Sequence, residues 1–502
     1  MAGGWISARA GRSARGGPVV LAAIAGALLL AGCASGTSKA GGAPETVAHG
    51  TITLTFASAD PLPADTTFVT MVNHDSDGHL RLRTLFLDAR SPDIDQTIAG
   101  DIRNRRIDVG DVGSRAWESL GVPAFSAYQA PFLVTSREVL DQSSTGTIAT
   151  ALLGTLRSIG ITGLAVVPDS IRYLYSTRPL TTLAQFSGAK IRINASVTSS
   201  EVISALGATP VTNIASGPDA LQALRDGSLT AIESNPQNAI ENGYIKAAPY
   251  VVANAPLFAK TDTFAVNSAR LAALPAGDAN VLRLAARQAA QTQDSSATDR
   301  TRWALACGEG LRPVALTEQQ FLALHNAEGP TYAALAADPQ TTLAIDRIGA
   351  LAVTEPRMDS WATCHGVGVS TSATGLLDGS YTDNVTQAEV AASGDCTDCG
   401  NAGTFRLVVS DGRYALYHPV QINANPDEPS VAFFAGWRPS DPVEVGIIWT
   451  AGNRVTQVPE VNQQNGSAPA TYTFDLFRGT FSLHLINGQA DLDTSHPWQR
   501  QS

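Results

Sequence analysis

The sequence predicts a large α/β body followed by a smaller all-β module. Strand-like and helical runs alternate over residues 51–267, helix signals alone follow to about residue 351, and β-branched and aromatic runs separated by turn residues occupy 379–500. The first pattern is typical of parallel sheets covered by helices, and the last of a small antiparallel barrel or sandwich. With 502 residues, 44% of them hydrophobic, the chain is long enough for two or three domains with buried cores.

The N-terminus has the pattern of a bacterial export signal. Three arginines within the first 15 residues precede an apolar run over 19–30, which is shorter than the roughly 20 residues that span a bilayer. Residues 30–33, Leu-Ala-Gly-Cys, then resemble a lipobox, in which the cysteine is lipid-modified and the chain is cut just before it. The alternative is a secretory signal with a chance cysteine near its end. We expect a signal peptide over 1–32, a lipid on Cys33 that holds the protein outside the cytoplasm at the membrane, and a flexible tether over 33–47.

The cysteines fit an oxidised, exported protein. If Cys33 carries lipid, four cysteines are left to form disulfides. We expect one bridge between Cys396 and Cys399, pinning a loop of the β module, and a second between Cys307 and Cys364. The segment Cys396-Thr-Asp-Cys399 also fits a redox pair or half a zinc site, and cross-pairing between the two sets stays open.

Local signals predict the elements of the body in order. Ile94, Ile98 and Ile102 recur every four residues and indicate one apolar helix face. Short runs rich in β-branched residues indicate strands between the helices. The predicted strands cover 51–58, 79–87, 106–113, 163–168, 171–176, 190–195 and 264–267.

Capping signals predict where several helices begin. Three segments start with threonine and carry Glu or Gln three residues later, the pattern of a capping box, at Thr135, Thr198 and Thr317. Asp278 precedes a run of Ala, Leu and Arg and is the predicted N-cap of a helix in the strand-free section.

The C-terminal module follows a breaker-rich linker over 366–378. Turn signals such as Asp411-Gly412 separate its predicted strands. Trp437, Trp449 and Trp498 are most simply core or edge aromatics, although a barrel mouth lined with them would suit an apolar ligand. The predicted strands cover 404–409, 443–449, 471–477 and 480–486.

Composition and motifs exclude several classes of function. The formal net charge of −11 argues against a general nucleic-acid binder. No zinc-protease, hydrolase-elbow, phosphate-loop or dinucleotide-binding motif occurs, and the histidines are scattered. We therefore expect a protein that is not an enzyme and has neither a metal nor a cofactor.

The segment 171–236 is the most specific part of the sequence. It contains Ile171-Arg-Tyr, Thr177-Arg-Pro-Leu, Gly188-Ala-Lys-Ile-Arg, a helix ending in Leu-Gly-Ala-Thr-Pro-Val, and the run ALQALRDGSLTAIESNP over 220–236. This succession resembles the solute-binding proteins of TRAP transporters, the DctP-like periplasmic receptors that capture organic acids. The strand over 106–113 and Pro131-Phe132 fit the same family, and the resemblance covers about residues 50–355.

The resemblance implies a two-lobed fold of the periplasmic-binding-protein type (type II) with a long hinge helix, over residues 48–365. The module over 379–502 lies outside it. That module resembles the calycin or lipocalin barrels in its Gly379-Ser-Tyr opening and its His496-Pro-Trp close, so a β-barrel-like domain is expected there.

The resemblance also implies a ligand site. Arg192 occupies the place of the family arginine that forms a two-pronged salt bridge to the substrate carboxylate, a role that suits the rigid fork of a guanidinium. Arg172 matches a second arginine that contacts the acid, and Asn235 or Ser234 falls where an amide hydrogen-bonds the ligand. The alternative for Arg192 is a surface arginine on a strand edge.

The implied function is capture of a small carboxylate-bearing acid and its delivery to a pair of integral membrane transporter subunits. The alternative is a sensing or scaffold lipoprotein that uses the β module to contact a membrane receptor or the envelope. One departure bears on the site: Thr230-Ala231 stands where relatives have Asp-Gly just before the glutamate. The sequence does not identify the acid.

Overall fold

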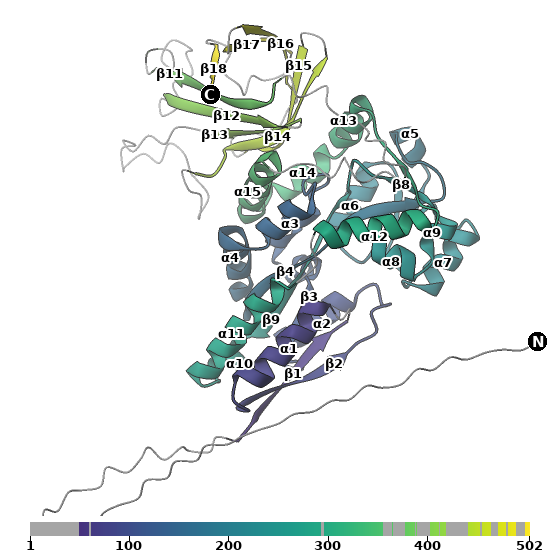
Figure 1. The fold of residues 1–502 in the computed structure, drawn as a ribbon, viewed down its shortest axis with the longest axis vertical. Helices are drawn as coiled ribbons and strands as arrows, with labels where there is room; N and C mark the ends of the chain where they lie inside the picture. The colour runs from purple at the N-terminus through teal and green to yellow at the C-terminus, as the bar shows by residue number, and fades with distance from the viewer. Residues whose placement is uncertain are drawn as a thin grey trace, which may run out of the picture. The chain divides into compact units, whose positions relative to one another are not determined.

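The computed structural model describes residues 50–59, 62–292, 296–354, 364, 377–386, 388, 402–410, 412–417, 440–451, 454–462, 470–477, 480–487 and 497–501. The predicted signal peptide, Cys33 with its tether, and the pair Cys396 and Cys399 lie outside the described residues. Figure 1 shows a body of helices and strands, and a separate group of strands formed by the C-terminal residues.

The first lobe is a sheet with the strand order β2-β1-β3-β9-β4. Strands β1, β2 and β3 are parallel, and β9 runs antiparallel to both β3 and β4. Helices α1 and α11 cover one face of this sheet, and α2 with the two short helices η1 and η2 packs on the other. The elements are β1 (Ile52–Ser58), α1 (Pro63–Asp75), β2 (Leu80–Phe86), α2 (Ile94–Arg103), β3 (Val109–Gly113), η1 (Ser114–Leu120), η2 (Pro123–Gln129), α3 (Arg137–Ser143), α4 (Gly146–Thr155), η3 (Leu156–Ile159) and β4 (Ile161–Ser176).

The second lobe continues the sheet in the order β4-β7-β5-β6. Strand β5 is parallel to β6 and β7, whereas β4 and β7 are antiparallel; β8 and β10 form a further parallel pair beside β4. The elements are α5 (Leu183–Phe186), β5 (Lys190–Arg192), α6 (Val197–Ala205), β6 (Thr209–Val211), α7 (Pro218–Arg225), β7 (Ala231–Ser234), α8 (Pro236–Glu241), α9 (Tyr244–Ala247) and β8 (Tyr250–Val252). The chain then returns to the first lobe as β9 (Phe258–Asn267).

Strand β4 joins the two lobes. The sequence predicts two strands, 163–168 and 171–176, but the structure forms one strand of 16 residues. Its residues 161–172 pair with β9 in the first lobe, and residues 173–176 pair with β7 in the second. Register shifts occur at Gly163/Ala165 and at Pro168/Ser170, and the second accommodates the proline as a bulge, so the gap between the two predicted strands is only a local bend.

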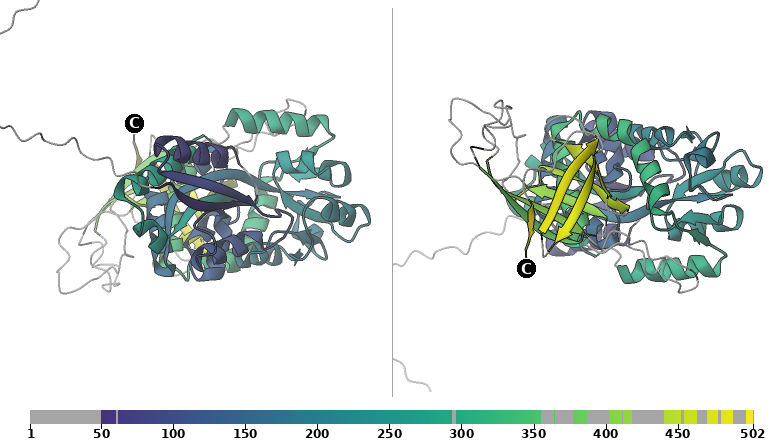
Figure 2. Two further views of the ribbon diagram at one scale, coloured as in Figure 1. Left: turned by 90° about the horizontal axis from the view of Figure 1, so that it is seen from below. Right: turned by 90° about the horizontal axis from the view of Figure 1, so that it is seen from above.

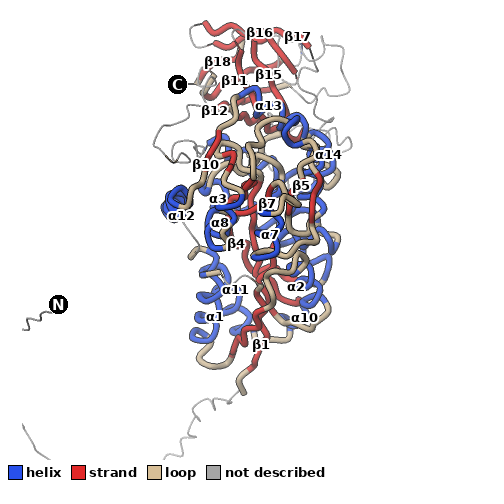
Figure 3. The backbone as a smooth tube through the Cα atoms, turned by 90° about the vertical axis from the view of Figure 1, so that its right-hand side faces the viewer, coloured by secondary structure: helices blue, strands red, loops and turns tan. Residues whose placement is uncertain are grey.

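Helices after β9 support both lobes and the C-terminal module. The hinge helix runs as two consecutive segments: α11 packs on α1 and β4, and α12 packs on α8 of the second lobe. Figure 3 shows these helices in blue along the red strands of the body. No helix in the described ranges is long and apolar enough to cross a bilayer. The elements are α10 (Ser268–Ala272), α11 (Ala276–Ala290), α12 (Ser296–Gly308), β10 (Arg312–Val314), α13 (Glu318–Ala327), α14 (Gly329–Leu335) and α15 (Pro339–Thr354).

One predicted disulfide is confirmed. Cys307, near the end of α12, is bonded to Cys364, with their Cα atoms 5.3 Å apart. Because the bridge closes a loop 57 residues long in sequence, it ties α12 to the chain that leads toward the linker.

The helix starts are only partly as predicted. The capping box at Thr317 is confirmed at the start of α13. The predictions at Thr135 and Thr198 are wrong, because Ser136 and Ser196 are the N-caps of α3 and α6, each accepting a hydrogen bond from the backbone NH three residues on. Both serines have extended backbone geometry, which points the hydroxyl back over the first turn.

The prediction for α11 is also wrong by one turn. The chain enters this helix at Pro275, which fixes a suitable backbone angle. Asp278 therefore lies inside the first turn, where a carboxylate is favoured by the positive end of the helix dipole.

The C-terminal strands form a closed antiparallel barrel in which each strand pairs with the next and β18 pairs with both β17 and β11. Its interior holds a core rich in aromatic residues that includes Trp498, while Trp437 lies outside the described residues. Figure 2 shows these strands in green to yellow. The strands are β11 (Gly379–Val385), β12 (Gly403–Ser410), β13 (Arg413–Tyr417), β14 (Glu444–Ala451), β15 (Arg454–Asn462), β16 (Ala470–Phe477), β17 (Thr480–Asn487) and β18 (Trp498–Arg500).

The outer face of the barrel packs against α15. Gly349 of α15 allows close contact, because a Cβ atom there would lie 2.6 Å from a methyl group of Val445 on β14. Beside this contact, Arg347 donates to both carboxylate oxygens of Asp441, at 3.0 and 2.7 Å. A buried bidentate pair and a close helix-strand contact fix the barrel to the body.

A buried docking cluster, formed by His325, Tyr332, Arg413 and Glu460, lies at the same interface. Arg413 of the barrel donates one Nη to Glu460 and the other to the backbone oxygen of Phe132, at 2.5 and 3.3 Å. His325 Nε2 lies 3.4 Å from the same Glu460 oxygen. Phe132 has a φ of 62°, a left-handed conformation that is unusual for an aromatic residue, so the barrel arginine binds a carbonyl at a strained turn.

Candidate functional site

The junction of the two lobes lies at Arg172. This residue ends the pairing of β4 with β9, and the next residue begins the pairing with β7. Its guanidinium Nε donates to Glu233 Oε1 in a close, buried ion pair. Ser170 Oγ lies between two predicted site residues: it accepts from Arg172 Nη1 at 3.4 Å and from Asn235 Nδ2 at 3.1 Å. The junction therefore brings Arg172 and Asn235 together.

Arg192 lies on β5, the strand next to β7, in register with Ile232. It is buried, with 3% of its surface exposed. Its one hydrogen bond to another described residue runs from Nε to the backbone oxygen of Ile214, at 3.1 Å. Burial lowers the pKa of Arg192; Glu233 and Tyr244 oppose this effect, and Arg115 and Arg172 add to it. A buried guanidinium with both Nη groups unused by the described protein is able to bind an anion.

A cleft cluster links Arg192 to the first lobe. We define it as Arg115, Arg172, Arg192, Asp95 and Glu233. Arg115 of η1 forms an ion pair with Asp95 at 3.1 Å, and its pKa, which burial would lower, is raised by Asp95 and Glu233. Burial likewise opposes ionisation of Glu233, but Arg172, Arg115 and Arg192 together lower its pKa, so it is a carboxylate. The cleft cluster thus has three cations against two anions.

The first lobe also presents an acid cluster, formed by Asp65, Asp111, Asp169, Asp262 and Lys260. Lys260 Nζ contacts Asp169 at 3.0 Å and Asp262 at 3.1 Å. Burial raises the pKa of Asp65 to about 6 and that of Asp262 to about 7, and it raises the pKa of Asp111 well above its ordinary range. Asp111 is therefore protonated at neutral pH, whereas Asp169 is a carboxylate, because Lys260 and Arg172 lower its pKa against the effect of burial.

The two lobes contact each other directly. Glu118 of the first lobe accepts from the backbone NH of Val197 at 2.6 Å and from Thr198 Oγ1 at 2.8 Å, at the start of α6 in the second lobe. Gln129 Oε1 accepts from Ser196 Oγ at 2.7 Å. A negative side chain at a helix N-terminus is favourable, so these contacts stabilise a closed arrangement.

A small cavity lies beside Arg115 of the cleft cluster. A cavity of about 10 Å³ is bordered by Arg115, Gln129 and Lys260, among others. This is about the volume that one water molecule requires.

The site predicted from sequence is partly assembled. Arg172, Arg192 and Asn235 are buried near the junction. Ser234 is buried on β7, but alternation along a strand directs its side chain to the face opposite that of Glu233. Sequence reasoning did not assign Arg115, whose position just after β3 was the available signal. Among the described residues, no group of three or more His, Cys, Asp or Glu side chains is arranged to hold a metal ion.

Two α/β lobes joined by crossing strands, with a buried cationic cluster between them, define the class of bilobed solute-binding proteins. The model for "Bacterial extracellular solute-binding protein, family 7" matches residues 62–337. The chain therefore belongs to this family, the DctP family.

Individual relatives agree with this assignment. The "C4-dicarboxylate-binding periplasmic protein DctP" of Rhodobacter capsulatus is 32% identical over 119 residues, a match that spans 24% of this chain and 35% of that protein. A TRAP periplasmic solute-binding protein of Ralstonia eutropha with bound (S)-2-acetolactate has a TM-score of 0.52 at 19% identity, covering 60% of this chain and 98% of that one. One from Shewanella oneidensis with bound succinate has a TM-score of 0.52 at 16% identity, covering 60% and 99%.

These structures also set the barrel apart. About 60% of this chain already matches 98% of one solved relative and 99% of the other. Neither relative therefore has a segment left that could correspond to the barrel. The body is the part shared with the family, and the eight-stranded barrel is an addition.

Proposed function

We propose that this protein is an extracytoplasmic solute-binding receptor that captures a small organic acid between its lobes and delivers it to a TRAP-type secondary transporter. The observation that carries the proposal is the buried Arg192, whose Nη groups have no partner among the described residues. A carboxylate matches the fork of a guanidinium and neutralises the surplus charge of the cleft cluster.

The other residues have distinct roles in this proposal. Arg172 is held by Glu233 and stabilises the ligand mainly through the electrostatic field of its positive charge. Asn235 and Ser170 orient the Arg172 side chain. Glu118 and Gln129 hold the lobes together once the acid is bound. Closure follows because an acid that contacts both lobes binds the shut form more tightly than the open one.

A thermal-shift and calorimetric screen of organic acids tests the proposal. The panel contains succinate, 2-hydroxy acids, 2-oxo acids and uronates. An acid at 100 times its Kd should stabilise the protein by about 2.7 kcal/mol. Arg192→Ala should weaken its binding at least about 100-fold, because the removed partner makes a buried, charge-assisted contact.

Arg178→Ala is the matched control, since Arg178 is an exposed arginine of the same lobe. It should leave the affinity unchanged. Equal binding of the acid by the wild type and Arg192→Ala contradicts the assigned role of Arg192. A panel in which no acid binds contradicts the proposed function itself.

The membrane attachment is proposed on sequence grounds alone. Metabolic labelling with an alkyne fatty acid should label the wild-type protein, and Cys33→Ala should abolish the label. Label that persists in Cys33→Ala places the lipid elsewhere. An unlabelled wild-type protein supports an ordinary secretory signal.

The firm docking of the barrel favours a second candidate role. Because Arg347 and Asp441 fix the barrel to α15, a ligand-driven movement of the body would carry the barrel with it, as a sensing lipoprotein requires. Adjacent genes for two membrane transporter subunits support delivery, and an adjacent kinase gene supports sensing.

A further inference from the structure

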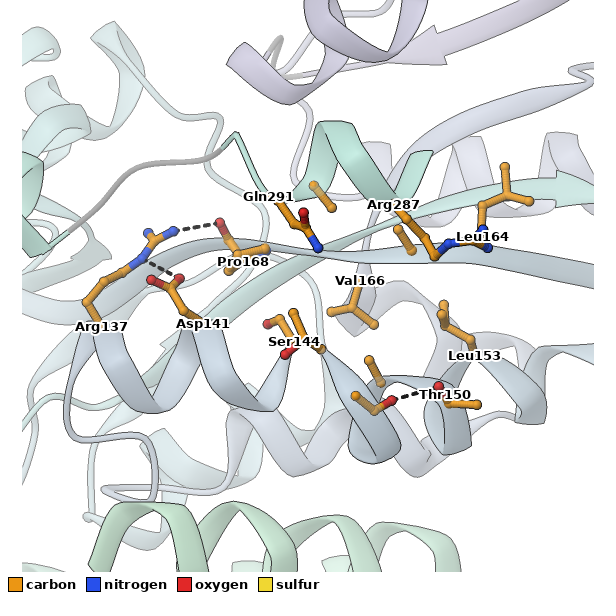
Figure 4. A pocket seen from close by; sticks show the side chains of 15 residues that line it. Arg137, Asp141, Ser144, Thr150, Leu153, Leu164, Val166, Pro168, Arg287 and Gln291 are labelled. Atoms are coloured by element: carbon orange, nitrogen blue, oxygen red, sulfur yellow. Dashed lines mark hydrogen bonds and ion pairs between the residues drawn. The ribbon is translucent and has the colours of Figure 1, made fainter. Parts of the chain in front are cut away.

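The first lobe contains a second cavity that does not include the cleft cluster. It has a volume of about 330 Å³ and lies between α3, α4, β4 and α11 (Figure 4). Small-molecule sites in proteins typically have volumes of about 300 to 1,000 Å³. The space is therefore large enough for an organic molecule, whereas the cavity beside the cleft cluster accommodates one water.

The fold produces this cavity through the irregular course of β4. This strand is the edge of the first-lobe sheet, so its segment 164–168 pairs only with β9. Val166 packs in the core that includes Leu152 of α4, and Leu164 packs in the core that includes Ala286 of α11, so the cavity lies where the two cores meet at the strand edge. Opposite them lie the small side chains of Ala149 and Ala290, which leave the space unfilled.

One end of the cavity is closed by a compensated ion pair. Arg137 is buried; its Nε pairs with Asp141 at 2.7 Å, and its Nη groups donate to the backbone oxygens of Asp169 and Pro168 at 2.7 and 3.3 Å. These carbonyls belong to the bulge, so Arg137 satisfies groups that the sheet leaves unpaired. Figure 4 shows this pair at the edge of the lining, and it adds no net charge.

The other polar groups give the cavity a preference for an anion. Arg287 of α11 lines the wall and forms no ion pair or hydrogen bond with another described residue. Gln291 and Ser144 add an amide and a hydroxyl. Leu153 and Val166 are apolar side chains on the α4 side of β4, and Leu164 lies on the other side of the strand (Figure 4). With Arg137 and Asp141 neutralising each other, Arg287 leaves one positive charge beside an apolar wall.

We infer that this cavity is a second binding site, for an amphipathic organic anion such as a medium-chain fatty acid. The apolar body lies on Leu153 and Val166, and the acid group pairs with Arg287. Its ligand differs from that of the cleft, where polar and charged groups surround Arg192. The site does not depend on the proposed transport function.

Titration of the full chain with octanoate tests the inference. Octanoate should bind the wild type with one-to-one stoichiometry. Arg287→Gln, an exposed substitution that leaves the core intact, should weaken binding at least about tenfold. Ala149→Leu, which fills part of the cavity, should do the same. Octanol, which has the same apolar body without the charge, should bind more weakly than octanoate.

Two control variants locate the binding. Arg283→Gln, one helical turn earlier on α11, and Arg192→Ala in the cleft should each leave octanoate affinity unchanged. Loss of binding in Arg192→Ala would place octanoate in the cleft and overturn the inference. Undiminished binding in Arg287→Gln, or no saturable binding to the wild type, overturns it as well.

Discussion

Two buried arginines show how differently the body and the barrel interface use the same side chain. Arg413, at the barrel interface, has a carboxylate on one Nη and a carbonyl on the other. Arg192, between the lobes, has a single carbonyl on Nε. Both are at most 3% exposed. Since burying a charge without partners is costly, Arg413, which has a partner on each Nη, is a structural element, and Arg192, with one partner, is the arginine that we propose binds the acid.

The largest expected effect comes from breaking the Arg172–Glu233 pair of the cleft cluster and the Arg413–Glu460 pair of the barrel interface in turn. Glu233→Gln and Glu460→Gln should each lower the free energy of unfolding by about 3 to 5 kcal/mol, because each leaves a buried arginine without its carboxylate. Urea denaturation measures this loss. The comparison predicts that a bound acid rescues only one variant. An acid bound in the cleft should restore much of the free energy of unfolding that Glu233→Gln loses. In Glu460→Gln the acid should add no more stability than it adds to the wild type. Equal rescue of the two variants by the acid would show that the cleft and the barrel interface do not differ in this way.

The next effect concerns pH. Glu328, the residue before α14, is fully buried, and burial raises its pKa to about 8 although Thr331 donates a hydrogen bond to it. The protonated form is favoured in the folded state, so its contribution is fully present below the unfolded pKa near 4.5 and is lost as pH rises through about 8.

Glu328→Gln should remove this pH dependence. Between pH 4 and pH 9 the free energy of unfolding of the wild type should fall by about 4 kcal/mol more than that of the variant. Urea denaturation at several pH values measures the difference. A constant difference across this range would mean that Glu328 is ionised in the folded protein.

A smaller effect tests geometry rather than charge. Arg192→Lys keeps the positive charge but loses the two-pronged fork, so affinity for the captured acid should fall about 100-fold, or about 2.8 kcal/mol. Calorimetry measures the affinity, and the free energy of unfolding without ligand serves as the control and should change little. Full affinity in the lysine variant would show that the cleft requires a charge only.

The smallest effect concerns closure. Glu118→Gln weakens the charge-assisted contacts to the start of α6, so ligand affinity should fall about fivefold to tenfold, or about 1 kcal/mol. Glu241→Gln on the exposed side of α8 is the control. Small-angle scattering without ligand should show a larger radius of gyration for Glu118→Gln; an identical radius and affinity would exclude Glu118 from closure.

Much of the fold was predictable because its signals are local or periodic. The α/β pattern, the family motif around Arg192 and the capping box at Thr317 depend on neighbouring residues. The start of α6 was not predictable, because Ser196 and Thr198 are both suitable caps and the choice is made by contacts from the other lobe. Glu118 binds the first amides of the helix, and Gln129 accepts from the Ser196 hydroxyl.

The sequence did not predict which residues form the cleft cluster, because they too are brought together by contacts between the lobes. Arg115 and Glu233 are 118 positions apart and belong to different lobes, so nothing near either one indicates that they influence each other. Strand β4 was misread as two strands because Pro168 ordinarily interrupts a sheet. Here the strand continues through a bulge, and Arg137 donates hydrogen bonds to the backbone oxygens of Pro168 and Asp169.

The contact of Gly349 with Val445 has a consequence for attempts to simplify this protein. A chain truncated at the linker would expose a helix face shaped to receive a β-strand, together with Arg347 deprived of Asp441. The two-lobed body is thus not equivalent to its shorter relatives, because part of its surface is covered by the barrel.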